Sequence, residues 1–134
     1  MIFELWEKAL KNPAKKAEAD QLKLLAEKAI KLLQSFQKVF PIGQPLTPIY
    51  RGWYQWLTGK PEAAIRTLQQ GLEAALKFKM PYEEGSIRLK LASYSQANLS
   101  ARKRNLWQAM EIFERMGARN ELRLAQEEAR KTGI

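Results

Sequence analysis

Apolar residues recur at intervals of three and four along most of this chain, a spacing that places them on one face of an α-helix. The longest run lies between Ala14 and Phe40, and the most regular one follows Pro61. The first contains Leu22, Leu25, Ala26, Ala29, Leu32, Leu33, Phe36 and Phe40, and the second contains Ala64, Ile65, Leu68, Gly71, Leu72, Ala75 and Leu76. No stretch alternates apolar and polar residues with a period of two. The pattern therefore predicts an all-α protein.

Proline, glycine and asparagine residues divide this pattern into about six to seven helices joined by short connections. Asn12 is a predicted helix cap, Gly59 and Gly117 each end a helix, and the segment 41–45 separates two helices. The predicted helices are residues 3–11, 14–40, 46–58, 61–78, 82–96, 101–116 and 120–131. Residues 98–100 are expected to form a loop, and Asn120 is expected to cap the last helix. Short connections favour antiparallel neighbours, so residues 1–134 are predicted to form one domain.

Small residues mark the place where two of these helices would cross. Gly52 lies in the segment 46–58, and Ala64 lies in the segment 61–78. Backbones approach closely only where side chains are small, so we expect these two positions to face each other. Gly59 lies between the two segments, and it is a candidate for a left-handed helix end.

The pair formed by residues 46–58 and 61–78 resembles a tetratricopeptide unit, an antiparallel helix hairpin that repeats to form a superhelix. The residues that carry the resemblance are Gly52, Gly59, Ala64, Leu68 and Gly71. A weaker second unit covers residues 82–116, where Ala92, Ala109 and Phe113 fit the pattern. The first two helices resemble a partial unit. The resemblance implies an α-α superhelix that binds other proteins.

A narrower resemblance rests on three strings taken together. They are Arg51-Gly52-Trp53 with Gly59-Lys60-Pro61-Glu62-Ala63-Ala64, then Met80-Pro81-Tyr82-Glu83-Glu84-Gly85, then Ile112-Phe113-Glu114-Arg115-Met116-Gly117-Ala118. They look like the C-terminal helical region of large bacterial signalling ATPases, many of which carry an adenylate/guanylate cyclase or kinase domain upstream. The resemblance implies that this chain is a fragment of a larger cytoplasmic protein. It would be the sensor or scaffold end, with the nucleotide chemistry in other domains.

Composition narrows the chemistry that the chain can perform. It has 134 residues and contains neither histidine nor cysteine. These absences remove the usual zinc ligands, thiolate chemistry and every histidine-dependent triad. The adjacent carboxylates Glu83-Glu84 and Glu127-Glu128 diverge by about 100° on a helix, so neither pair converges on a substrate. We therefore expect no catalytic site, cofactor or metal, and helix-end electrostatics is the interpretation of these acids.

Charge leaves a second function class open. The 23 basic and 14 acidic residues give a formal net charge of +9, which is compatible with a nucleic-acid-binding module. The densest basic cluster is Arg102-Lys103-Arg104, followed by Trp107. Because the positive charge is spread along the chain, a solvated helical surface is the favoured interpretation, and Trp107 is expected in the core. No apolar run is long enough to cross a membrane, and no signal peptide is recognised at the start.

The remaining expectations concern partners. Arg51, Gln55 and Arg88 would line a concave surface, where the arginines pair with carboxylates of a protein or peptide, or of another domain of the same chain. The aromatic residues of segment 46–58 form either such a groove or, as we favour, helix packing. A homodimer is a further hypothesis, with Phe3, Leu5 and Trp6 as one contact face.

Overall fold

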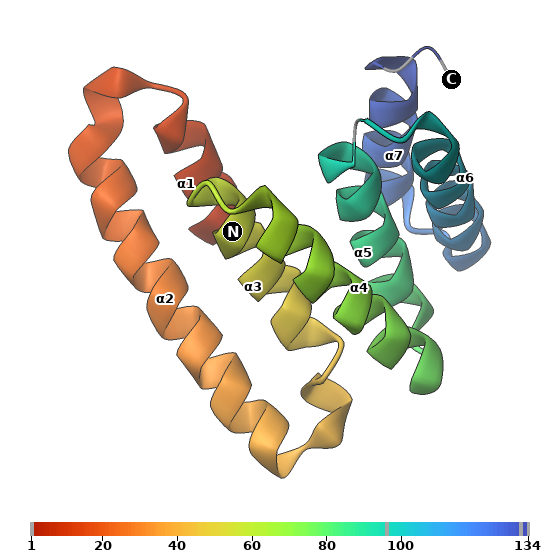
Figure 1. The fold of residues 1–134 in the computed structure, drawn as a ribbon, viewed down its shortest axis with the longest axis horizontal. Coiled ribbons are helices and arrows are strands. Elements are labelled where there is room, and N and C mark those ends of the chain that lie inside the picture. Colours follow the sequence, from red (N-terminus) through yellow and green to blue (C-terminus); the bar gives the residue numbers. More distant parts are fainter. Residues whose placement is uncertain (1, 96, 132, 134) are drawn as a thin grey trace.

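The computed structural model describes residues 2–95, 97–131 and 133, and within these ranges the chain is all-α (Figure 1). The helices are α1 (Ile2–Leu10), α2 (Lys16–Val39), α3 (Leu46–Leu57), α4 (Pro61–Lys77), α5 (Pro81–Tyr94), α6 (Leu99–Met116) and α7 (Arg119–Lys131). Two short 3-10 turns, Pro13–Lys15 and Pro41–Gly43, precede α2 and α3. The described residues contain no strand, so the predicted fold class is confirmed. None of their helices combines the length and the apolar character that crossing a bilayer requires.

Most helix ends lie at the proline, glycine and asparagine residues that predicted them. Gly59 and Gly117 adopt the left-handed conformation, with φ of 81° and 71°. Gly59 follows the last residue of α3 by two positions and Gly117 directly follows α6, so each lies at a helix end as predicted. Asn12 accepts a hydrogen bond from the backbone N–H of Ala14, although the turn that it caps is a 3-10 turn. Glycine suits both left-handed positions because it has no Cβ to clash with the backbone.

Two boundary predictions are wrong. Leu99 and Ser100 belong to α6 rather than to a loop, because Asn98 caps this helix by accepting from the N–H of Ala101 at 3.1 Å. Asn120 does not cap α7, which already begins at Arg119. The left-handed turn at Gly117 leads almost directly into α7, so no room is left for a separate cap one residue later.

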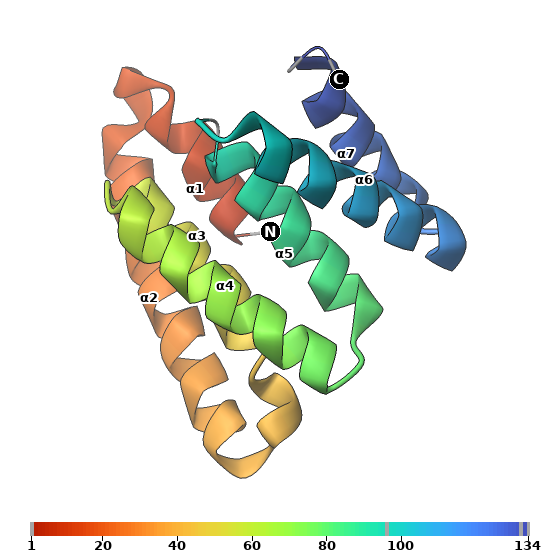
Figure 2. The ribbon, with the colours of Figure 1, turned by 45° about the vertical axis from the view of Figure 1, so that its right-hand side comes forward.

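The helices stack as antiparallel neighbours in two layers. Each odd-numbered helix packs against the even-numbered helix that follows it, and each even-numbered helix packs against the next odd one. The odd-numbered helices also contact one another in the order α1, α3, α5 and α7, whereas no two even-numbered helices are in contact within the described residues. Because consecutive helices reverse direction, the four odd-numbered helices run the same way (Figures 1 and 2). They form one continuous inner layer.

The close approach expected between α3 and α4 is present. A Cβ atom added at Gly52 would lie 2.8 Å from Cγ of Leu68 and 3.4 Å from the carbonyl oxygen of Ala64. Both Ala64 and Leu68 are fully buried. Gly71 of α4 has a similar role where α3, α4 and α5 meet. A Cβ atom added at Gly71 would lie 2.7 Å from Cβ of Pro48 in α3. The small residues named from the sequence therefore set the spacing between α3 and α4.

The second predicted unit also buries its marker residues. Ala92, Ala109 and Phe113 have no exposed area. A Cβ at Gly85 would lie 2.8 Å from the Phe113 ring, so α5 and α6 approach closely at this point. The core continues as clusters of buried side chains shared by successive helices rather than as one central core.

The predicted inward face of α2 is only half correct. Ala26 is buried, but Leu25, Leu32, Phe36 and Phe40 are exposed, with Leu32 at 73%. Helix α2 has 24 residues whereas its partner α1 has nine, so its two neighbours cover one side only.

Candidate functional site

A groove of about 520 Å³ runs along the inner layer, and all four odd-numbered helices contribute to it. Its walls and floor come from Glu4 and Glu7 of α1, Leu46, Ile49, Tyr50 and Trp53 of α3, Tyr82, Glu83, Ser86, Leu89, Lys90, Ser93 and Tyr94 of α5, Phe113 of α6, and Asn120, Glu121, Leu124, Glu127, Glu128 and Lys131 of α7. Residues more than a hundred positions apart in sequence thus meet on one surface. We call this surface the inner groove.

Aromatic side chains form the part of the inner groove between α1 and α3. The indole N–H of Trp53 donates to Oε2 of Glu7 at 3.0 Å, which orients the carboxylate. The same ring lies beside that of Phe3, with centroids 5.2 Å apart and planes tilted by 32°. The Nζ atom of Lys90 lies 3.3 Å from the centroid of the Trp53 ring. The aromatic residues of α3 therefore pack against α1 and also line the groove, which combines the two interpretations made from the sequence.

Two cations, Lys131 and Lys90, are among the described residues that line the inner groove, and the less exposed of them is Lys90. Burial lowers the pKa of its ammonium group to about 8, even though Glu7 and Glu4 act in the opposite direction. Taking a charged ammonium out of water disfavours its protonated form. The cation–π contact with Trp53 compensates for part of the lost hydration.

The inner groove is acidic although the chain as a whole is strongly basic. Six glutamates and two lysines line it, while the full sequence has a net charge of +9. Glu127 and Glu128 form ion pairs with Arg123 and Arg102. The other glutamates of the groove have no ion-pair partner within the residues that the structure describes. Positive charge therefore lies mainly outside this surface.

Two of the unpaired carboxylates flank an exposed aromatic ring. Glu83 lies in the first turn of α5 and Glu121 in the first turn of α7. Tyr82 is 44% exposed between them, and burial together with the charge of Glu121 raises the pKa of its hydroxyl. Leu124, 42% exposed, adds an apolar surface one helical turn further along α7. This end of the groove offers carboxylates beside apolar contact area.

The arginines expected to line the concave surface are located elsewhere. Arg88 donates to Glu84 at 2.8 Å and to Asn105 at 3.1 Å, so its guanidinium is used in joining α5 to α6. Arg51 is exposed, but it borders a depression between α2 and α3 rather than the inner groove. Gln55 is half-buried, and its Oε1 atom has no hydrogen-bond partner among the residues that the structure describes. The prediction that arginines here meet partner carboxylates is therefore not supported by their positions.

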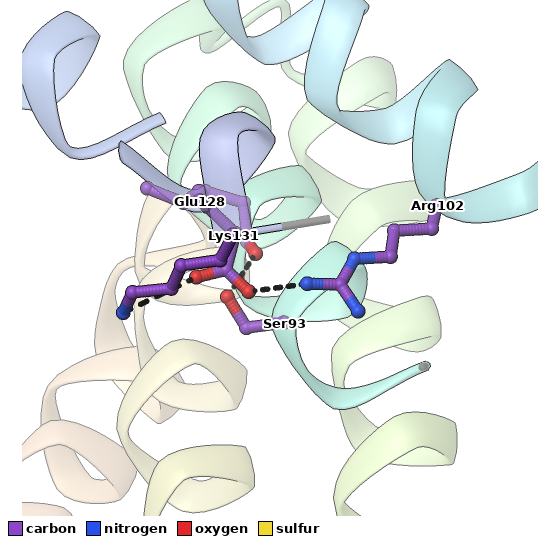
Figure 3. Close-up of polar contacts among 5 residues, drawn as sticks. Ser93, Arg102, Glu128 and Lys131 are labelled. Carbon is purple, nitrogen blue, oxygen red and sulfur yellow. Dashed lines mark hydrogen bonds and ion pairs between the residues drawn. The ribbon is translucent and has the colours of Figure 1, made fainter. Parts of the chain in front are cut away.

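The three residues of the basic cluster in α6 differ in their exposure to solvent. Arg102 is only 7% exposed, and its Nη2 atom lies 2.8 Å from Oε1 of Glu128, so it is not accessible to a phosphate. Figure 3 shows Glu128 of α7 between Arg102 and Lys131, with Ser93 of α5 beside it. Lys131 Nζ lies 3.9 Å from Glu128 Oε2. The pair between Arg102 and Glu128 fastens α7 to α6, whereas the pair between Lys131 and Glu128 lies within α7.

Trp107 is exposed, contrary to the prediction that it belongs to the core. It is 56% accessible and borders a depression with Met110, Gln126, Ala129 and Arg130. The buried seam of α6 runs through Leu106, and Trp107 follows it by one residue, about 100° around the helix. Arg104 is exposed and Lys103 is half-buried on the same helix.

The apolar residues near the N-terminus do not form the contact face that was expected. Phe3 and Trp6 are 3% and 2% exposed, because they pack under Tyr50, Trp53 and Tyr54 of α3. Only Leu5 of that cluster faces solvent. The larger exposed apolar surface is instead on α2, where Leu32 and Phe36 lie on the uncovered side.

The acidic groove itself was missed by sequence reasoning. Glu83 was interpreted as a helix-end charge and Glu121 was given no role, because nothing in the local sequence reveals that the two residues share a surface. First-turn acids gave no usable signal, because they occur in α2 and α4 as well as in α1, α5 and α7 and are absent from α3. No cluster of potential metal ligands occurs in the described part of the chain.

Comparisons of this chain with protein-family models, with curated proteins and with solved structures find no match.

Proposed function

We propose that this chain is a non-catalytic scaffold whose inner groove binds a segment of another protein, or of another domain of the same protein. The observation that carries the proposal is that four helices running in the same direction, α1, α3, α5 and α7, all contribute side chains to one groove. A surface built from successive helix pairs can hold a long partner segment at several points.

The packing order supports a tetratricopeptide-like interpretation of the fold. Alternating contacts between odd and even helices, with close approach at Gly52 and Gly71, are what stacked helix hairpins require. Together with the resemblance to C-terminal regions of bacterial signalling ATPases, this favours a regulatory or sensory role in the cytoplasm. Under this proposal any nucleotide chemistry belongs to other domains.

The side chains of the inner groove suit binding. Tyr82 and Leu124 are exposed there, and apolar contact area of this kind stabilises a complex when a partner covers it. Trp53 and Lys90 are held in place by contacts within the protein, so the groove is largely formed before a partner arrives. A preformed surface loses less conformational freedom on binding.

The test is selection of peptides on the immobilised chain from a random library of about twelve residues, which reach ~40 Å when extended. Leu124→Asp in the inner groove should abolish binding of the selected peptides. Leu76→Asp is the matched control, because Leu76 has similar exposure, 50% against 42%, and lies on α4 outside the groove. Binding lost equally in both variants, or no selected peptide, would rule out the proposal.

A nucleic-acid-binding role is the second candidate, and the exposed Trp107 beside Arg104 favours it. An exposed indole can stack on a base while neighbouring cations contact phosphates. The corresponding test is the affinity for a single-stranded oligonucleotide across a range of salt concentrations. Affinity that falls steeply with salt and is reduced by Trp107→Ala, but not by Leu124→Asp, would support this role instead.

A further inference from the structure

We infer that the partner segment recognised by the inner groove is basic, with lysine or arginine side chains directed at Glu4, Glu83 and Glu121. This inference rests on the proposed function and adds the chemistry of the partner. A chain with a net charge of +9 would by itself favour acidic partners. The groove has the opposite sign, with six glutamates against two lysines, so the local surface rather than the total charge selects the ligand.

The carboxylates named are available to a ligand. Glu4, Glu83 and Glu121 form no ion pair within the residues that the structure describes. Each lies in the first turn of its helix, and the three helices α1, α5 and α7 run in the same direction. Glu121 acts on the Tyr82 hydroxyl beside Glu83, whereas Glu4 acts with Glu7 on Lys90 further along α5, so the carboxylates are distributed along the groove and can meet several cationic side chains of one segment.

Compensation of helix dipoles does not account for all of this charge. A carboxylate in a first turn stabilises its own helix, which is a sufficient reason for one acid at each helix start. Glu7 lies in the second turn of α1 and lines the groove as well. It is held toward Trp53 by a 3.0 Å hydrogen bond, so its remaining carboxylate oxygen is oriented rather than mobile. The acidic character extends beyond the helix starts.

The apolar part of the groove fits the stems of basic side chains. Lysine and arginine carry three or four methylene groups that pack on apolar surfaces while the charged end stays near carboxylates. Tyr82 and Leu124 provide such a surface beside Glu83 and Glu121. A guanidinium can also stack on the exposed face of Tyr82. An acidic segment would place carboxylates against these glutamates without compensation.

The deciding experiment uses the random peptide library on the full chain. We expect the selected peptides to be enriched in lysine and arginine, and their affinity to fall as salt is raised. The triple variant Glu4→Gln, Glu83→Gln, Glu121→Gln should weaken binding about tenfold, since several exposed ion pairs are lost together. The control triple Glu62→Gln, Glu73→Gln, Glu114→Gln removes the same charge from exposed positions on α4 and α6 and should leave the affinity unchanged.

A second arm changes the peptide instead of the protein. Replacing the basic residues of a selected peptide by glutamine should weaken its binding to the unmodified chain by a similar factor. This measurement does not depend on the folding of any protein variant. Selected peptides that are neutral or acidic, yet lose binding in Leu124→Asp, would overturn the inference while the proposed function stands. Failure to select any peptide would remove both.

Discussion

Adding one methyl group at Gly52 tests the contact on which the α3–α4 pair depends. In Gly52→Ala the new Cβ would lie 2.8 Å from Cγ and 3.0 Å from Cδ2 of Leu68. Leu68 is fully buried, and Cγ is its branch point rather than its flexible end, so the side chain cannot move aside without disturbing the core. We expect the substitution to be destabilising even though alanine favours helices.

Two opposing terms set the magnitude. Alanine stabilises a helix interior by about 1 kcal/mol relative to glycine. Overpacking a well-filled core costs about 1–3 kcal/mol. The net expectation for Gly52→Ala is a loss of about 1 kcal/mol, which lowers Tm by roughly 3 °C for a domain of this size. In a Leu68→Ala background the clash is absent, so the same substitution should instead stabilise by about 1 kcal/mol.

Urea denaturation followed by circular dichroism measures the four free energies of this double-mutant cycle. The expected coupling between the two positions is about 2 kcal/mol. Gly59→Ala serves as the control, because it is strained by a φ of 81° but has no atom within 4 Å of the added Cβ. Its cost of about 1 kcal/mol should be the same with either residue at position 68. Gly52→Ala that stabilises the unmodified protein would refute the packing argument.

Three further predictions concern charge and burial. In the unmodified protein the free energy of unfolding should rise by up to about 3 kcal/mol between pH 8 and 10.5, because the unfolded lysine keeps its proton over that interval while folded Lys90, with a pKa of about 8, releases it. Lys90→Met should abolish this rise. Unfolding measured across this pH range would contradict the prediction if both proteins gave the same slope. Arg102→Met removes the closer ion pair of the largely buried Glu128 carboxylate and should cost about 3 kcal/mol in urea unfolding, whereas Arg123→Gln, which breaks an exposed pair, should cost less than about 1 kcal/mol. Equal losses would show that burial is irrelevant here. In α2, Ile30→Ala should lower Tm by several degrees and Leu32→Ala should leave it nearly unchanged, since the two side chains are 8% and 73% exposed; the reverse order would mean that the helix faces the other way.

The fold class was predictable because it depends on local pattern. Apolar spacing of three and four, interrupted by Gly59, Pro61 and Pro81, identifies helices without any knowledge of neighbours. The left-handed position at Gly117 was equally local, since few residues other than glycine adopt that conformation easily. The exact starts of α6 and α7 were less predictable, because an asparagine can cap a helix or lie within its first turn with little difference in sequence.

The exposure of individual faces was predicted less well. Leu32 has the same three-four spacing as other apolar residues of its helix, and its exposure is decided by which neighbouring helix covers it. Because α1 is much shorter than α2, one side of α2 stays uncovered. A pattern that repeats along one helix contains no information about the length or angle of its partner.

The amino-acid sequence by itself determined the helices, their order and the small residues Gly52 and Gly71 that allow close helix contacts. These features follow from backbone geometry and side-chain size over a few residues. Only the tertiary structure decided the groove. Glu4 and Glu121 are separated by most of the chain, and they share a surface because alternate helices run in the same direction and contact one another. The buried Arg102 and the acidic groove within a basic chain have the same origin, since burial and local charge depend on which distant side chains meet.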